Sequence, residues 1–239
     1  MVLGTLFFVA AVLYSSVGHA GASGYLTAMA LIGLAPGIMK PTALVLNIVV
    51  GVIALVRFSR ASFFSWPLLW PFALGSVPFA FLGGAVQLPG HWYRILVGTI
   101  LFLAAARLAL ESSASASATR PMPVLPAVAA GAAIGLLSGL TGTGGGIFLS
   151  PLLLFTGWAE TRETGGVSAA FIVVNSLAGL AGNVSAIRGL PSTLPVWIVV
   201  VAAGGVIGSE LGSRRVATHT FRRLLALVLL VAGLKLILT

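Results

Sequence analysis

The chain has 239 residues, of which 59% are hydrophobic and only 7% are charged, and its formal net charge is +9 at pH 7. A soluble domain needs far more charge to cover its surface, so this composition excludes a soluble protein and indicates an integral membrane protein. The chain has no cysteine, which excludes disulfides and thiolate metal sites. We expect the excess of Lys and Arg to orient the chain in the lipid bilayer and not to bind nucleic acid.

Apolar runs recur along the whole chain, and the first starts at Val2 without a basic segment or a cleavage site, as a retained membrane segment would. Backbone groups inside a bilayer must be satisfied internally, and the runs lack the alternation of barrel strands, so we expect helices. The runs cover residues 1–17, 25–35, 42–57, 67–86, 92–110, 124–140, 146–157, 166–187, 194–211 and 221–238. The second and seventh are too short to cross comfortably. We therefore predict an all-α polytopic membrane protein of about eight helical segments, counting each broken pair as one.

Two glycine-rich breaks divide the chain into similar halves. Gly18-His-Ala-Gly-Ala-Ser-Gly24 interrupts one apolar run, and Gly139-Leu-Thr-Gly-Thr-Gly-Gly-Gly146 interrupts another half a chain later. Each break is followed by a short apolar stretch, a lone basic residue and an Asn-x-x-x-Gly motif. Residues 75–107 also align without a gap on residues 204–236. Duplicated halves with glycine-broken segments are typical of transporters whose site lies between the halves.

The boundary between the halves is a low-complexity stretch. Residues 111–123 contain Ser, Ala and Pro in a pattern typical of a flexible connector. We predict a first transmembrane repeat at 1–110, a linker at 111–123 and a second transmembrane repeat at 124–239, all in one integral membrane domain.

The distribution of Lys and Arg distinguishes two topologies. If each broken segment makes one net crossing, the basic residues divide six against seven and define no orientation. If each broken segment turns back as a re-entrant hairpin, nine basic residues share one side, namely Arg57, Arg60, Arg107, Arg120, Arg162, Arg214, Arg215, Arg222 and Arg223. Four lie on the other side, namely Lys40, Arg94, Arg188 and Lys235. Only the hairpin arrangement obeys the positive-inside rule, so we expect inverted repeats with both termini outside the cytoplasm.

The glycine breaks carry the functional prediction. Adjacent glycines in residues 141–146 each cost about 1 kcal/mol in a helix interior, so the helix should unwind there. Unwound backbone at membrane depth is tolerated only where it faces protein or a watery cavity, and its N–H groups can bind an anion there. The predicted substrate-binding residues in the breaks are His19, Gly21, Ser23, Gly24, Thr141, Gly142, Thr143, Gly144, Gly145 and Gly146. The alternative is close helix packing, which we favour for the Gly-xxx-Gly stripes at 131–139 and 204–212.

Three kinds of polar residue inside the apolar runs extend this prediction. Asn47 and Asn175 occupy matching positions, and each could bind substrate or tie the repeats together by a hydrogen bond. His19 could donate to an oxyanion or carry a coupling proton, and we match its position in the second repeat to Leu140. We expect Glu210 to form an interfacial ion pair with Arg214 or Arg215; a proton carrier is the alternative.

Several segments resemble the sulfite exporter TauE/SafE family, also called the toluene-sulfonate uptake permease family. They are Ser138-Gly-Leu-Thr-Gly-Thr-Gly-Gly-Gly-Ile-Phe-Leu-Ser-Pro151, Gly166-Val-Ser-Ala-Ala, and the stretch 204–215. The resemblance implies secondary transport of small sulfur-containing anions, such as sulfite, organosulfonates or sulfoacetate, across the inner membrane. The first repeat has fewer glycines than the second, and Gly-Val-Ser stands where Gly-Thr-Ser is commoner, which leaves the substrate open.

Enzyme function finds little support. The chain has no aspartate, no Ser-His-acid set in one plausible pocket and no phosphate loop. Two alternatives to a transporter are a passive anion channel and a noncatalytic membrane subunit of a larger complex. We expect no cofactor and no metal. The expected partners are a small anion and the bilayer, with a coupling proton and a homodimer as further options.

Overall fold

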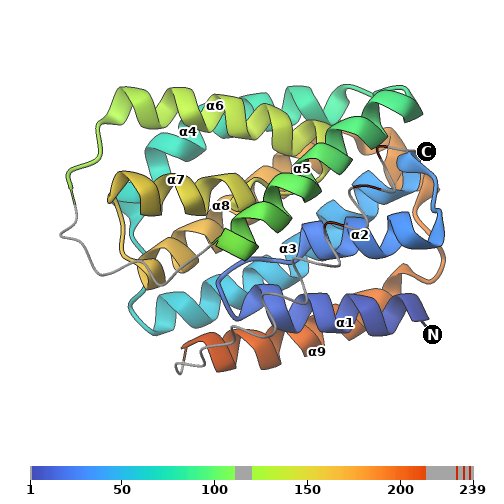
Figure 1. The fold of residues 1–239 in the computed structure, drawn as a ribbon, viewed down its shortest axis with the longest axis horizontal. Helices are drawn as coiled ribbons and strands as arrows, with labels where there is room; N and C mark the ends of the chain where they lie inside the picture. Colours follow the sequence, from blue (N-terminus) through green and yellow to red (C-terminus); the bar gives the residue numbers. More distant parts are fainter. Residues whose placement is uncertain (1, 111–119, 214–229, 231–233, 235–236, 238–239) are drawn as a thin grey trace.

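The computed structural model of the chain is built of helices packed along one another (Figure 1). It describes residues 2–110, 120–213, 230, 234 and 237. The elements are α1 (Val2–Ser15), α2 (Ala22–Ile32), α3 (Pro36–Arg60), α4 (Trp66–Ala85), α5 (Gly90–Leu110), α6 (Val124–Thr141), α7 (Gly146–Thr156), α8 (Thr161–Gly182), the 3₁₀ helix η1 (Val184–Gly189) and α9 (Leu194–Ser213). Within the described residues, α3, α4, α6, α8 and α9 are long and apolar enough to cross a membrane. The prediction of an all-α polytopic membrane protein is confirmed.

The predicted apolar runs correspond to these helices, but two helices begin well before their predicted starts: α8 begins at Thr161 instead of residue 166, and the start of α3 differs by slightly more. The run was expected from residue 42, whereas α3 begins at Pro36, where a proline suits the first turn of a helix. The early start places Lys40 inside the bundle, where it is only 6% exposed. The predicted run at 221–238 lies outside the described residues, apart from three single positions, and most of the linker also does.

Each glycine break turns the chain back on itself. Figure 1 shows α1 and α2 running in opposite directions, and α6 and α7 doing the same. The backbone N–H of Arg120, just before α6, donates to the carbonyl of Gly157 at the end of α7 over 2.7 Å. The start of α6 and the end of α7 therefore lie at one end of the bundle, as expected for a re-entrant hairpin.

The basic side chains agree with the hairpin arrangement. Arg57 and Glu210 form an ion pair of 2.7 Å, and the Arg162 guanidinium lies 5.0 Å from the centre of the Phe63 ring. Arg57, Phe63 and Arg162 thus share one end of the bundle, whereas a single crossing of the broken segments would put Arg162 at the opposite end from Arg57. The orientation of this end in a membrane stays a prediction.

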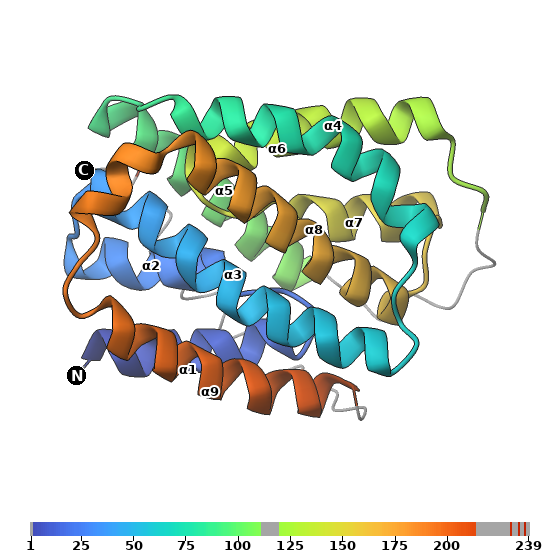
Figure 2. The same ribbon diagram turned by 180° about the vertical axis from the view of Figure 1, so that it is seen from behind.

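The two halves pack in a reciprocal way. α4 packs on α6 as α9 packs on α1, α4 packs on α8 as α9 packs on α3, and α3 and α8 contact each other in the middle (Figure 2). The stripe glycines allow this close approach, since a Cβ at Gly135 would overlap the Ser76 backbone and one at Gly208 would overlap the Val12 carbonyl. The packing role predicted for both glycine stripes is confirmed. The inverted relation of the repeats and their exact boundaries stay predictions, which this packing supports.

Candidate functional site

The second break is a short irregular segment between α6 and α7. Three glycines in it have left-handed backbone angles, with φ of +82° at Gly142, +75° at Gly144 and +81° at Gly145. These angles are unfavourable for residues with a Cβ, so the glycines allow the chain to leave one helix and enter the next within four residues. Gly142 ends α6, and Gly145 precedes the first turn of α7.

The backbone of this break holds a row of unpaired donors. The N–H of Gly142 donates to the Ser138 carbonyl over 2.8 Å. In contrast, the N–H groups of Thr143, Gly144, Gly145 and Gly146 make no hydrogen bond within the described part of the chain, although all four residues are buried. Buried N–H groups are nearly always paired in folded proteins. Four consecutive exceptions at a helix N-terminus are typical of an anion-binding segment.

The two predicted threonines have different roles. The Thr141 hydroxyl donates to the Leu137 carbonyl in its own helix over 2.7 Å, while its carbonyl accepts from the Tyr93 hydroxyl over 3.0 Å. The Thr143 hydroxyl lies 3.1 Å from that of Thr141 and can accept or donate there. Thr143 is therefore the better candidate to contact a ligand, and Thr141 fixes the end of α6. Tyr93 was not predicted, because a tyrosine in an apolar run gives no signal of its partner.

Asn47 reaches the second break from α3. Its side chain is fully buried, its Nδ2 lies at the long distance of 3.5 Å from the Gly142 carbonyl, and its Oδ1 has no hydrogen bond among the described residues. A Cβ at Gly144 would lie 2.9 Å from Asn47 Nδ2 and 3.2 Å from Ser176 Oγ. Asn47 and Ser176 therefore flank the unpaired N–H groups. Ser176 is a member of the site that sequence reasoning missed, although it follows Asn175 directly.

Asn175 has a local partner instead. Its Nδ2 donates to the Phe171 carbonyl of its own helix over 2.9 Å, and its Oδ1 is unpaired within the described residues. The side chain is fully buried on α8. The structure thus gives Asn175 no described contact with the second break.

The first break has the same kind of backbone, since the buried N–H groups of residues 20–24 also make no hydrogen bond among the described residues. Gly18 and Gly21 have left-handed φ angles of +78° and +102°, and the Tyr25 hydroxyl donates to the Ala20 carbonyl over 2.7 Å. A Cβ at Gly24 would lie 2.6 Å from that of Ala10, so Gly24 serves the packing of α2 on α1. The predicted residue Ser23 is buried in the first turn of α2, on the side of the first break.

His19 joins the two breaks. Its Nε2 lies 3.1 Å from the Gly146 carbonyl oxygen and 3.0 Å from Ser150 Oγ, which in turn lies 2.7 Å from Ser168 Oγ. Its Nδ1 lies 3.2 Å from the Val17 carbonyl oxygen. The imidazole of the first break therefore contacts the start of α7, so the two breaks lie next to each other; a substrate site between two repeats stays a prediction. Ser150 and Ser168 were not predicted.

The match of His19 to Leu140 was wrong. The left-handed glycines set the correspondence between the breaks, because Gly18 and Gly142 each stand three residues before the glycine that caps the next helix. On this correspondence His19 matches Thr143. The sequence comparison aligned glycines by type and could not tell which of them have left-handed angles.

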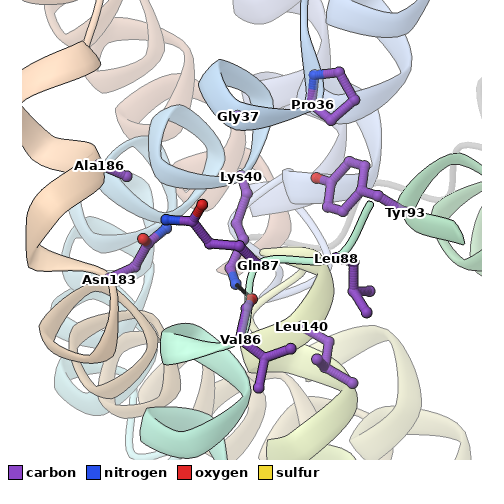
Figure 3. A pocket seen from close by; sticks show the side chains of 10 residues that line it. All are labelled: Pro36, Gly37, Lys40, Val86, Gln87, Leu88, Tyr93, Leu140, Asn183 and Ala186. Atoms are coloured by element: carbon purple, nitrogen blue, oxygen red, sulfur yellow. Dashed lines mark hydrogen bonds between the residues drawn. The ribbon is translucent and has the colours of Figure 1, made fainter. Parts of the chain in front are cut away.

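A cavity of about 250 Å³ borders the second break on the side of Lys40 (Figure 3). Its walls come from the start of α3, the connection between α4 and α5, the start of α5, the end of α6, and the segment after α8. The lining residues are Pro36, Gly37, Lys40, Val86, Gln87, Leu88, Tyr93, Leu140, Asn183 and Ala186. Sequence reasoning assigned Lys40 to orientation alone, since a lone basic residue near the end of an apolar run usually marks a membrane interface.

The Lys40 ammonium occupies the end of α4. It donates to the carbonyl oxygens of Gly83 at 3.0 Å, Gly84 at 2.9 Å and Val86 at 3.0 Å. These carbonyls lie where a helix leaves acceptors unsatisfied and where its dipole is negative, so a cation is stabilised there.

Glu210 makes the predicted kind of contact with a different partner. Its carboxylate pairs with Arg57 of α3 over 2.7 Å, whereas Arg214 and Arg215 lie outside the described residues. The pair connects α3 to α9, and so joins one half of the chain to the other.

Comparison with known proteins agrees with the sequence and the fold. The chain matches the family described as "Sulfite exporter TauE/SafE" over residues 3–236. It is 43% identical over 239 residues to the probable membrane transporter protein y4hK of Sinorhizobium fredii (strain NBRC 101917 / NGR234), covering 98% of this chain and 97% of that protein. No solved structure matches the chain. These similarities give the chain a role in membrane transport as a multi-pass membrane protein, and it belongs to the sulfite exporter TauE/SafE family.

Proposed function

We propose that the chain is a secondary transporter for a small sulfur-containing anion, such as sulfite, an organosulfonate or sulfoacetate. The anion binds at the second glycine break, between the halves, and is exposed alternately to the two sides of the inner membrane. The observation that supports this most is the row of four buried N–H groups at residues 143–146 that have no partner among the described residues, beside the Asn47 amide and the Thr143 hydroxyl.

The chemistry of the break favours an anion over a cation or a neutral solute. The N–H groups and the positive end of α7 attract negative charge, and an oxyanion can accept several hydrogen bonds at once. Asn47 adds an amide whose hydrogen-bonding capacity is largely unused, although the side chain is fully buried. A bound oxyanion would satisfy these donors, which otherwise stay buried without partners.

The position of the break favours alternating access. The break belongs to the second half, while Asn47 and His19 approach it from the first half. A movement of one half against the other would therefore change both the shape of the site and its exposure. Binding at such an interface couples the anion to the movement, whereas a passive channel needs no such coupling.

The test measures binding and transport separately in purified protein. Sulfite, methanesulfonate, sulfoacetate, sulfate and acetate are added in a thermal-shift series, and the same anions are offered to proteoliposomes. A ligand of the folded state should raise its stability by about 2.7 kcal/mol at a hundredfold excess over the dissociation constant. Accelerated exchange when unlabelled anion is present on the far side would indicate a carrier, and linear, non-saturating flux would indicate a channel. Transport of cations or neutral solutes alone would reject the proposal.

A matched pair of threonine substitutions locates the site. Thr143→Val keeps the side-chain shape and removes one donor, so anion binding should weaken by about 1–2 kcal/mol. Thr27→Val is the control, because Thr27 is also buried, lies in α2, and has a hydroxyl without a described partner. Equal effects of both variants on affinity would show that the anion does not bind at Thr143.

A further inference from the structure

We propose that the cavity beside Lys40 is a second binding site for small anions, in which an anion is held before it reaches the glycine break. This inference rests on the proposed function, since it concerns the same class of anion. It assigns a ligand-binding role to Lys40, Gln87 and Asn183, which surround the cavity with Tyr93 (Figure 3).

The charge of Lys40 is the first argument. Its ammonium is buried and is held by three neutral carbonyl groups, and no described carboxylate lies within ion-pair distance of it. The carbonyls offset part of the cost of burying this charge but do not neutralise it, and low-dielectric walls strengthen its field in the adjacent cavity. Among the described residues that line the cavity, Lys40 is the charged one and none is acidic. All three N–H groups of the ammonium donate to carbonyls, so an anion in the cavity would be held by the charge of Lys40 and would accept its hydrogen bonds from other groups.

The size and polar groups of the cavity fit a small oxyanion. A water molecule occupies about 30 Å³ in the liquid, so 250 Å³ holds an anion of about five heavy atoms together with several waters. Gln87 comes from the connection after α4 and Asn183 from the end of α8, so their amides can donate to an anion from different walls.

The cavity also adjoins the glycine break. Tyr93, which lines the cavity, donates to the carbonyl of Thr141 over 3.0 Å. A Cβ at Gly142 would lie only 3.0 Å from the Lys40 carbonyl oxygen, so the backbone of α3 contacts the break directly. The two sites thus share a wall, as expected for successive positions of one transported anion.

The chain has no cysteine, so single cysteines can report on the cavity. Gly37→Cys places a thiol in the cavity lining, and Gly189→Cys places one outside it. Both glycines are exposed, and a Cβ at either would meet no atom within 4 Å, so both variants should fold. Each is labelled with the anionic reagent 2-sulfonatoethyl methanethiosulfonate and with the cationic 2-(trimethylammonium)ethyl methanethiosulfonate. The readout is the ratio of the two labelling rates.

We expect Lys40→Met to lower the anion-to-cation labelling ratio about tenfold at Gly37→Cys and less than about twofold at Gly189→Cys. Methanesulfonate should slow labelling at Gly37→Cys in protein that retains Lys40, and it should not do so at Gly189→Cys. If Lys40→Met fails to fold, the slower labelling of Gly37→Cys in the presence of methanesulfonate tests the proposal on its own. Equal responses at both positions, without protection at Gly37→Cys, would overturn the proposal.

Transport assays keep the two proposals apart. Methanesulfonate transport without protection at Gly37→Cys would reject the cavity site and leave the proposed function standing. Protection at Gly37→Cys in a protein that transports no anion would support the cavity site and reject the proposed function.

Discussion

The two glycine breaks have similar backbones and different chemistry. Both turn the chain from one helix into a short antiparallel helix, and both use left-handed glycines three residues apart. In the first break, Tyr25 donates to the Ala20 carbonyl and the His19 ring extends to the other half. The second break is instead flanked by the Asn47 amide and the Thr143 hydroxyl, while both breaks leave a row of buried N–H groups, at residues 20–24 and 143–146, without partners among the described residues.

This difference indicates how a duplicated fold can divide its tasks. The backbone geometry provides the same turn in each half, since left-handed glycines are needed wherever the chain reverses so tightly. The side chains then decide which turn exposes its backbone to a ligand. In this protein the second break has the Asn47 amide and the Thr143 hydroxyl beside its N–H groups, and the first break contributes His19 to the contact between the two breaks.

The largest expected effect concerns the hairpins themselves. If both breaks are re-entrant, Ser117→Cys in the linker should be labelled only from the cytoplasm, and Gly189→Cys only from outside. Membrane-impermeant maleimide, applied to right-side-out and inside-out vesicles, measures this as an all-or-none result. Labelling of both positions from the same side would rule out inverted repeats.

The next effect tests the unequal roles of the matching asparagines. Asn47→Asp puts a carboxylate beside the N–H groups at 143–146, so it should repel an anion and weaken binding by at least about a hundredfold, or roughly 2.7 kcal/mol. Asn175→Asp is the same change at the matching position, where the amide bonds within its own helix. We expect Asn175→Asp to alter the affinity for the anion by less than about threefold, measured on the folded fraction of the variant. Titration calorimetry on monodisperse protein measures both. Similar losses would mean that the two halves contribute equally to the site.

A smaller effect is expected at His19. Its Nδ1 faces the Val17 carbonyl oxygen, and its Nε2 faces the Gly146 carbonyl oxygen and the Ser150 hydroxyl. The Ser150 hydroxyl in turn contacts that of Ser168. A protonated ring can donate to both carbonyls at once, whereas a neutral ring has one N–H to give. Protonation should therefore strengthen the link between the halves. We expect His19→Gln to flatten the pH dependence of transport between about pH 5 and 8, where histidine titrates, and Ser168→Ala to keep it. An unchanged pH profile in His19→Gln would make the imidazole a purely structural contact.

The helices and the packing stripes could be predicted from the sequence because they depend on local hydrophobicity and on small residues at regular spacing. The fold class, the short second and seventh segments and the packing roles of Gly135 and Gly208 all follow from such patterns. The location of the glycine breaks was predictable for the same reason, since a run of glycines cannot continue a helix.

The partners of polar side chains could not be predicted, because they depend on contacts between distant segments. Lys40 was expected at a membrane interface, but it lies 43 residues from Gly83 in sequence and donates to its carbonyl. Ser150 and Ser168 carry no sequence signal until α7 and α8 are packed together with His19. The correspondence of His19 to Thr143 likewise could not be predicted, because it depends on which glycines have left-handed backbone angles and residue types alone do not show this.

The smallest expected effect separates a structural contact from a functional one. Arg57 and Glu210 join α3 to α9, and their side chains are 39% and 32% exposed, so solvent screens the attraction between them. Glu210→Gln should therefore lower the stability of the folded protein by no more than about 1 kcal/mol. Arg57→Gln should cost a similar amount, and the double variant should cost less than the sum of the two single changes, because the same interaction is lost in each. Thermal unfolding in detergent measures these values.

If Glu210 instead carries a coupling proton, Glu210→Gln would abolish proton-dependent transport while leaving stability intact, whereas we expect transport and its pH dependence to be preserved.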